Sequence, residues 1–135
     1  MRPRVPARGR RLSRSAEFER VYRQGRSVAN RHFVLYSFPN ASVARPRLGL
    51  SVSRKVGGAV ERNHVKRLLR EAFAQAESEL SAGQDVVLVA RPEARELAER
   101  EGLAGVAAAL TELIDRARLR DAERAGATAQ RQEAS

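Results

Sequence analysis

The residues of this chain with the most evident chemistry lie in one short run, from Glu61 to Arg70, whose sequence is ERNHVKRLLR. The run contains four fixed cations, an amide and an imidazole, and it falls at the start of a predicted helix over 59–80. Apolar residues recur at helical spacing along one side of this helix, and most of the cations fall on the other side. We expect the apolar side to pack on the protein, which leaves the basic side to contact a polyanion or to be solvated.

The two sides of this predicted helix are read from a wheel of about 100° per residue. Arg62 is the exception, because it falls near the apolar edge, and we expect its side chain to reach outward or to dock in a groove of the partner. The apolar side comprises Val65, Leu68, Leu69, Ala72, Phe73, Ala76 and Leu80, and the basic side comprises Asn63, Lys66, Arg67 and Arg70.

Positive charge is concentrated in the first half of the chain. Residues 1–70 contain 18 Lys and Arg against 3 Asp and Glu, whereas residues 71–135 contain 8 against 13. The resulting net charges of +15 and −5 add up to the formal +10 of the whole chain. Solubility alone is better served by mixed signs, so this separation indicates a surface that binds phosphate.

The groups that a protein nuclease needs are scarce in the basic half. Its only carboxylates are Glu17, Glu19 and Glu61, and the two histidines of the chain, His32 and His64, have no spacing typical of metal ligands. Glu17 and Glu19 suit the positive end of a predicted short helix. The chain has no cysteine, which excludes disulfides and thiol chemistry. We therefore expect no catalytic residue and no metal site on the protein.

The order of predicted elements indicates a single α+β domain in which helices cover a small sheet. A strand over 47–53 alternates, so that Gly49, Ser51 and Ser53 form a small polar face that a ligand can approach closely. The predicted order is a helix at 16–24, a strand at 31–38 with a possible short strand at 27–30, the strand at 47–53, the helix at 59–80, a strand at 85–90, and a last helix that Pro92 can start and Gly102 interrupts.

We expect the domain to span residues 12–119, between a disordered basic arm at 1–11 and a polar disordered tail at 120–135. The arm lacks the apolar centre of a secretory signal, and no apolar stretch approaches the roughly 18 residues of a membrane span. We also expect a cytoplasmic location.

Three runs in register carry a resemblance to a known family. They are SVANRHFVLY at 27–36, GLSVSRKVG at 49–57 and AVERNHVKR at 59–67. In this order and spacing they resemble the protein subunit of bacterial ribonuclease P, over about residues 10–118. The family's pattern at the start of the basic helix is Arg-Asn-Arg, and here His64 stands in the third place.

The resemblance implies a fold and a function. The fold is a two-layer α+β sandwich of the ribosomal protein S5 domain 2-like type, with a left-handed βαβ crossover around the basic helix, where the general rule favours a right-handed one. In the family, an RNA subunit is the catalyst and requires Mg²⁺, and the protein alone is inactive. Together they remove the 5′ leader of precursor tRNA. The expected partners are this RNA and precursor tRNA, with no membrane and no required protein partner.

The resemblance also implies two binding surfaces. Single-stranded RNA binds by stacking on aromatic rings and by contacts of cations with its backbone. Phe18, Tyr22 and Tyr36 can form such a platform, unless Phe18 and Tyr36 are simply core residues. The surface for the catalytic RNA comprises Arg54, Lys55, Arg62, Asn63, His64, Lys66, Arg67 and Arg70. The cleft for the leader comprises Phe18, Tyr22, Arg31, Val34, Tyr36, Ser51 and Ser53.

Two alternatives from other classes remain open at this point. The chain can be a non-enzymatic RNA-binding or ribosome-associated module of similar fold. It can also be a DNA-binding protein that places its basic helix in a groove. Composition does not separate these, and the three runs in register favour the ribonuclease P subunit.

Overall fold

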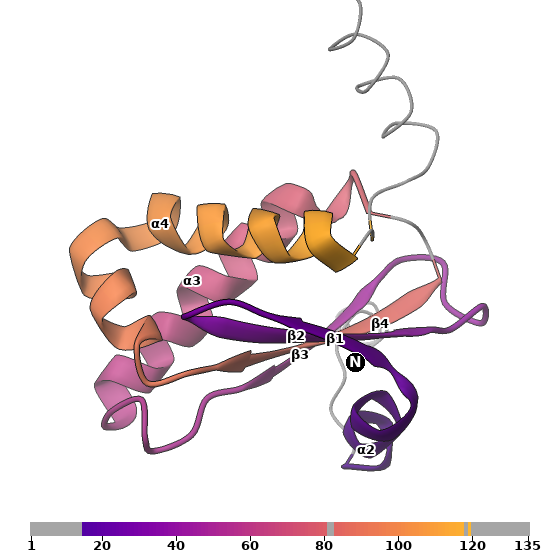
Figure 1. Cartoon of the computed structure of the whole chain (residues 1–135), viewed down its shortest axis with the longest axis horizontal. Coiled ribbons are helices and arrows are strands. Elements are labelled where there is room, and N and C mark those ends of the chain that lie inside the picture. Colours follow the sequence, from indigo (N-terminus) through magenta and orange to yellow (C-terminus); the bar gives the residue numbers. More distant parts are fainter. Residues whose placement is uncertain (1–14, 81–82, 118, 120–135) are drawn as a thin grey trace, which may run out of the picture.

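The computed structural model describes residues 15–80, 83–117 and 119. The predicted arm at 1–11 and the tail at 120–135 lie outside these residues. In chain order the elements are α2 (Ser15–Gln24), β1 (Arg26–Ala29), β2 (Phe33–Pro39), β3 (Arg47–Ser51), α3 (Ala59–Glu77), β4 (Gln84–Ala90) and α4 (Ala94–Ala117) (Figure 1).

The four strands form one mixed sheet in the order β1-β2-β4-β3. β2 pairs antiparallel with both β1 and β4, and β3 pairs parallel with β4. β4 is therefore an internal strand, as its apolar sequence predicts. The connection from β3 to β4 runs through α3 and joins neighbouring parallel strands. Its left-handed crossover stays a prediction that rests on the resemblance.

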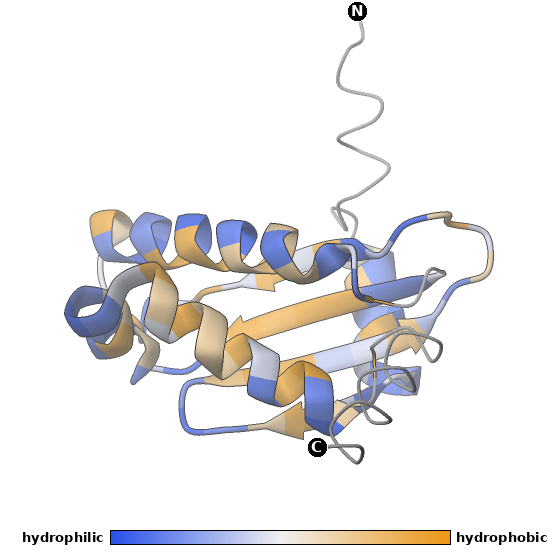
Figure 2. Cartoon of the chain, turned by 90° about the horizontal axis from the view of Figure 1, so that it is seen from above, coloured by the Kyte–Doolittle hydropathy of each residue, from blue (hydrophilic) through white to orange (hydrophobic). Residues whose placement is uncertain are grey.

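The helices α3 and α4 pack side by side over one face of the sheet (Figures 1 and 2). Phe33, Leu35 and Leu88 point from the sheet into this core, and each is completely buried. Burial of a side chain of this size contributes about 1.5–3 kcal/mol. The predicted α+β architecture is confirmed, and this face holds the main core of the described residues.

The helix α2 lies against the opposite face of the sheet and covers only part of it (Figure 1). Val21 of α2 and Val87 of β4 are completely buried there, in a cluster separate from the main core. The two-layer arrangement of the sheet with α3 and α4 thus acquires a partial third layer. The rest of this second sheet face remains accessible.

Several element boundaries differ from the predicted ones by one to three residues, and the hydrogen bonds explain two of the larger differences. The helix predicted to reach Leu80 ends at Glu77, where the Leu80 amide donates to the Glu77 carbonyl at 3.1 Å in a tight turn. The strand predicted from 31 starts at Phe33, because the Asn30 side chain accepts from the amides of His32 and Phe33 at 3.0 and 2.9 Å. The strand predicted to reach Ser53 ends at Ser51.

The predicted interruption of the last helix at Gly102 is confirmed. Gly102 has φ 60° and ψ −146°, a conformation that only glycine adopts readily, and it separates two helical parts within α4. No helix among the described residues has the length and apolar character needed to cross a membrane.

Candidate RNA interface

Three rows of residues cross the sheet on the face that carries α2. We call Ala29, Val34, Val89 and Ser51 the open row, because all four are only half-buried. The covered row consists of Ser27, Tyr36, Val87 and Gly49, of which all but the exposed Ser27 at the sheet edge are buried or half-buried. The anchor row consists of Phe38, Asp85 and Arg47. The open row contains two of the predicted leader-binding residues, Val34 and Ser51, and its small side chains leave room for a close approach.

The three aromatic residues predicted to form a platform do lie together. The rings of Tyr22 and Tyr36 are 4.9 Å apart in an edge-to-face arrangement, and the rings of Phe18 and Tyr22 are 6.3 Å apart. Tyr22 is 39% exposed, whereas Phe18 and Tyr36 are half-buried against Val21 and Val87. Tyr36 lies two residues from Val34 along β2, so this aromatic group adjoins the open row.

Cations surround the end of the sheet beyond the open row. Arg31 is exposed in the turn between β1 and β2, and Ser53, Arg54 and Lys55 are exposed directly after β3. Because β3 and β4 are parallel, their carboxyl ends meet at this same end. The predicted leader-binding and RNA-binding residues of this region therefore lie close together in the fold.

Arg91 is a further cation at this end that the sequence analysis missed. It follows β4, is exposed, and its backbone amide donates to the His32 carbonyl at 2.9 Å, which continues the pairing with β2. Alternation along β4 places Arg91 on the same face as Val89 of the open row. Its guanidinium donates to the Asn30 carbonyl at 3.2 Å. The signal in the sequence was an arginine directly after a buried strand.

The basic side of α3 faces solvent and its apolar side is buried, as predicted. Val65, Leu68 and Leu69 are at most 4% exposed. On the other side Asn63, Arg67 and Arg70 are exposed, and Arg62, His64 and Lys66 are half-buried. Among the described carboxylates, none pairs with Lys66 or Arg70, so the charge of these two side chains is available to a partner.

Arg62 and His64 have specific local contacts. The Arg62 Nε donates to the Gly58 carbonyl at 3.4 Å, so this side chain extends back along the first turn of α3. Arg67 Nη2 lies 3.0 Å from Nδ1 of His64. A guanidinium only donates, so this contact is a hydrogen bond when the hydrogen of the His64 ring is on Nε2 and Nδ1 accepts. Arg67 also lies 3.5 Å from Glu71, which offsets part of its charge.

A loop at 52–58 joins the two predicted surfaces. The Val56 amide donates to the Ser53 carbonyl at 3.0 Å, which closes a turn within the loop. The Val56 side chain is 3% exposed, so it packs in the core and holds the loop in place. Its exposed Arg54 and Lys55 lie between the end of β3 and the start of α3. The open row and the basic side of α3 are therefore continuous through this loop.

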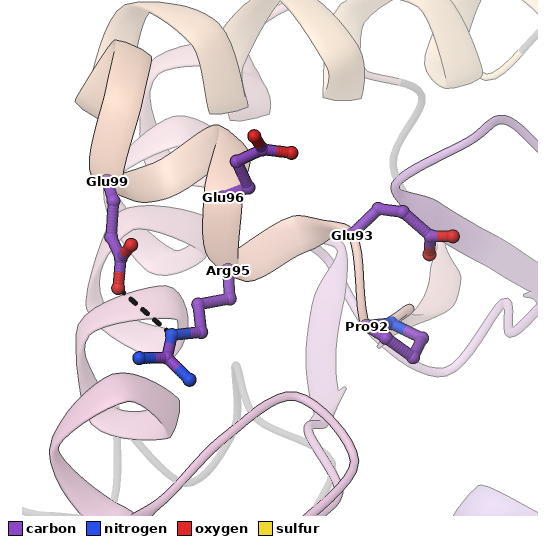
Figure 3. A pocket seen from close by; sticks show the side chains of 5 residues that line it. All are labelled: Pro92, Glu93, Arg95, Glu96 and Glu99. Atoms are coloured by element: carbon purple, nitrogen blue, oxygen red, sulfur yellow. Dashed lines mark hydrogen bonds and ion pairs between the residues drawn. The ribbon is translucent and has the colours of Figure 1, made fainter.

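A shallow pocket at the start of α4 has a different character. It is lined by Pro92, Glu93, Arg95, Glu96 and Glu99 (Figure 3). Arg95 Nε donates to Glu99 at 3.0 Å, and this hydrogen bond raises the pKa of Arg95 above its ordinary value. Three carboxylates around a paired cation repel phosphate, so this pocket is not part of an RNA surface.

Within the described residues, no three His, Cys, Asp or Glu side chains are grouped so that they could hold a metal ion. The only metal in the sequence predictions is the Mg²⁺ of the holoenzyme, which the resemblance places mainly on the RNA.

The fold and these residues define a basic α+β domain with an open sheet face beside a cationic helix. The family model described as Ribonuclease P matches residues 7–118. The chain therefore belongs to the ribonuclease P protein family, whose members are protein components of a tRNA-processing ribonucleoprotein, and an RNA is its partner.

Individual relatives agree with this membership. The chain is 49% identical over 85 residues to the ribonuclease P protein component of Brevibacillus brevis, which covers 63% of this chain and 68% of the relative. The structure of the Staphylococcus aureus RNase P protein matches with a TM-score of 0.74 and 35% identity, over 83% of this chain and 98% of that one. The structure of the Thermotoga maritima RNase P protein in complex with 1-(4-fluorophenyl)-2-thiourea matches with a TM-score of 0.71 and 33% identity. The match covers 78% of this chain and 98% of that one.

Proposed function

We propose that this chain binds the catalytic RNA of ribonuclease P through the basic side of α3 and the single-stranded 5′ leader of precursor tRNA through the open row. It thereby assists the endonucleolytic removal of the leader, which produces the mature 5′ end of the tRNA. The observation that carries the proposal is the continuity of these two surfaces through Arg54 and Lys55. A substrate strand on the open row is thus held next to the RNA that cuts it.

The open row suits a single strand rather than a duplex. Bases stack on accessible aromatic rings, and the exposed ring of Tyr22 and the half-buried ring of Tyr36 lie together beside the row. The small residues Ser51 and Ala29 let the strand lie close to the sheet. The cations Arg31 and Arg91 then contact its backbone, which gives affinity with little dependence on base sequence.

Catalysis in this proposal lies in the RNA. The protein contributes cations that reduce the repulsion between the leader and the catalytic RNA, which are both polyanions. The Mg²⁺ that the reaction needs is held mainly by RNA phosphates. The protein then lowers the Mg²⁺ concentration at which the substrate is held well enough to be cut.

The test is cleavage of a precursor tRNA that carries a 5′ leader, by a bacterial ribonuclease P RNA at low Mg²⁺, with and without this protein. We expect the protein to stimulate cleavage at the mature 5′ end and to leave a 5′-phosphate on the tRNA. The protein without the RNA should produce no cut. Tight RNA binding without stimulation would instead indicate a separate RNA-binding module.

A competition experiment addresses the DNA-binding alternative. A single-stranded RNA leader should compete for the open row, and a duplex DNA of equal charge should compete poorly at the same salt concentration. Stronger competition by the duplex would contradict a single-strand site.

A further inference from the structure

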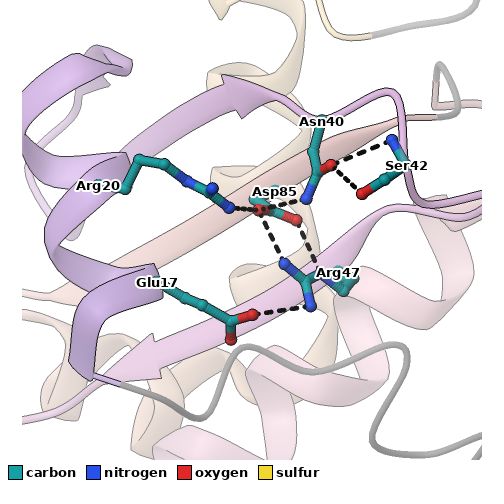
Figure 4. A network of polar contacts seen from close by, with 6 residues as sticks. All are labelled: Glu17, Arg20, Asn40, Ser42, Arg47 and Asp85. Atoms are coloured by element: carbon teal, nitrogen blue, oxygen red, sulfur yellow. Dashed lines mark hydrogen bonds and ion pairs between the residues drawn. The ribbon is translucent and has the colours of Figure 1, made fainter.

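The anchor row contains a buried ion network that joins the sheet to α2 (Figure 4). Asp85 of β4 is completely buried and accepts hydrogen bonds from three side chains. Arg47 of β3 donates to both of its oxygens, at 2.9 and 3.1 Å, and Asn40 donates at 3.0 Å. Arg20 of α2 lies 3.5 Å from the same carboxylate. A buried charge with this many partners is held in one geometry.

Arg47 also reaches α2 directly. Its Nη1 lies 3.0 Å from Glu17, and the side chains of Arg47 and Glu17 are only 12% and 23% exposed. The hydrogen bond with Asp85 raises the pKa of Arg47 above its ordinary value, so this side chain is a cation at any pH relevant to the protein. Glu17 and Arg20 are three residues apart, so they lie on one side of α2. Glu17 contacts Arg47 and Arg20 contacts Asp85, both of the anchor row.

The other contacts of α2 with the sheet involve mainly its apolar and aromatic side chains. Phe18 packs against the cluster of Val21 and Val87, the Tyr22 ring meets the Tyr36 ring, and the Arg20 guanidinium lies 5.4 Å from the centre of the Phe38 ring. Among residues 16–24 only Val21 is completely buried. A helix of 10 residues is not stable by itself, and apolar burial is not directional, so Val21 does not define how the helix is turned. At the far end, Gly25 approaches the sheet so closely that a Cβ atom would lie 2.5 Å from the Ser37 carbonyl oxygen. The position of α2 on the sheet thus depends on Gly25 at one end and on the ion network at the other, together with the apolar contacts of Phe18, Val21 and Tyr22.

We propose that Glu17, Arg20, Arg47 and Asp85 are positioning residues for leader binding. The network sets how α2 lies on the sheet, and α2 carries Phe18 and Tyr22. It therefore sets the contact between Tyr22 and Tyr36 on which the leader bases would stack. This inference rests on the proposed function and adds to it a set of residues that have no expected contact with RNA.

The informative variant is Glu17→Gln, tested in the holoenzyme. It removes the ionic attraction between Arg47 and α2 and leaves only a weaker neutral acceptor at residue 17. The buried pair of Arg47 and Asp85 stays intact, so no buried charge loses its partner. The matched control is Glu19→Gln, two residues away on the same helix. Glu19 is exposed and pairs only with Arg23 of the same helix, at 3.3 Å, within the described residues.

Both variants remove one negative charge from α2. Near bound RNA, the loss of a negative charge reduces electrostatic repulsion, so by itself it strengthens RNA binding or leaves it unchanged. We expect Glu17→Gln nevertheless to weaken binding of leader-bearing precursor tRNA by about fivefold, a size typical of one partly buried ion pair. Glu19→Gln should show no loss. Binding of mature tRNA and of the catalytic RNA should be unchanged in both variants.

The chain has two tyrosines, Tyr22 and Tyr36, and their NMR signals report directly on the position of α2 on the sheet. In the protein labelled on tyrosine, NMR should show the ring–ring contact, and Glu17→Gln should shift both ring signals while Glu19→Gln leaves them in place. Unchanged ring signals in Glu17→Gln would overturn the proposal, and so would a loss of affinity that extends equally to mature tRNA. Failure of the wild-type protein to stimulate cleavage would refute the proposed function, a separate outcome from these.

Discussion

Arg62 lies in the first turn of α3, where its side chain extends back toward Gly58. A cation at this place can reach a phosphate beyond the start of the helix. We predict that Arg62→Ala weakens binding of the catalytic RNA by roughly tenfold, as expected for loss of one hydrogen bond to a charged group. Binding of an isolated leader should change much less, because Arg62 is on α3 and not on the open row.

The control for this measurement is Arg100→Ala. Arg100 is exposed on α4 and pairs with Glu96 at 3.2 Å, so its loss removes the same charge from another surface. Filter binding of both RNAs at one salt concentration gives the comparison. Equal losses of catalytic RNA and of leader in Arg62→Ala would show that the two surfaces are not separate.

Tyr36 is the aromatic residue that belongs to the sheet itself. We predict that Tyr36→Ala weakens binding of precursor tRNA by about 1–3 kcal/mol, the usual value of one stacked base, and spares mature tRNA, which has no leader. Tyr36→Phe keeps the ring and should retain most of the affinity. If mature tRNA is weakened as much as precursor tRNA in Tyr36→Ala, the role of Tyr36 is structural.

At the scale of elements, α4 depends on a glycine at its bend. Gly102 has φ 60° and ψ −146°, and nothing lies within 4 Å of the place of an added Cβ atom. The cost of Gly102→Ala is therefore conformational and not steric. We predict a loss of about 1–3 kcal/mol in the free energy of unfolding, measured by denaturant titration.

A comparison variant for Gly102→Ala lies in the helical part that follows. Ala104 is exposed, and Ala104→Gly should cost only about 1 kcal/mol through helix propensity. A protein with Gly102→Ala that is as stable as the wild type would mean that α4 can straighten at residue 102 without a penalty.

At the scale of the whole molecule, the formal net charge of +10 and its concentration in residues 1–70 govern the response to salt. Each phosphate neutralised by a cation releases a counterion, so the logarithm of the RNA affinity should fall linearly with that of the salt concentration. The slope should be about −0.7 to −0.9 per phosphate contacted. We predict a steeper slope for precursor tRNA than for mature tRNA, since the proposed function assigns Arg31 and Arg91 to the leader alone.

This prediction is checked by titration of the holoenzyme with both tRNAs over a series of salt concentrations. Arg91→Ala should reduce the slope for precursor tRNA by about 0.7 and leave the slope for mature tRNA as it is. A response to salt that is flat for both tRNAs would contradict a phosphate-binding surface.

The sequence alone determined the features that depend on neighbours along the chain. The apolar stripe of α3 predicts its buried side, and the strand that became β4 is recognisable from its apolar run. Gly102 interrupts its helix because of its own backbone freedom. The separation of charge, and the family resemblance through three short runs, also need no knowledge of the fold.

Only the tertiary structure decided which residues meet across the sheet. Asp85 and Arg47 are 38 residues apart in the sequence, and their contact depends on the parallel pairing of β3 with β4. Asp85 and Arg20 are 65 residues apart, and their contact depends on the position of α2 on the sheet. Arg91 lies near the open row for the same reason. Local periodicity shows which face a side chain occupies, but strand order and register determine its neighbours. The anchor row and the position of α2 over part of the second sheet face therefore became visible only in the folded chain.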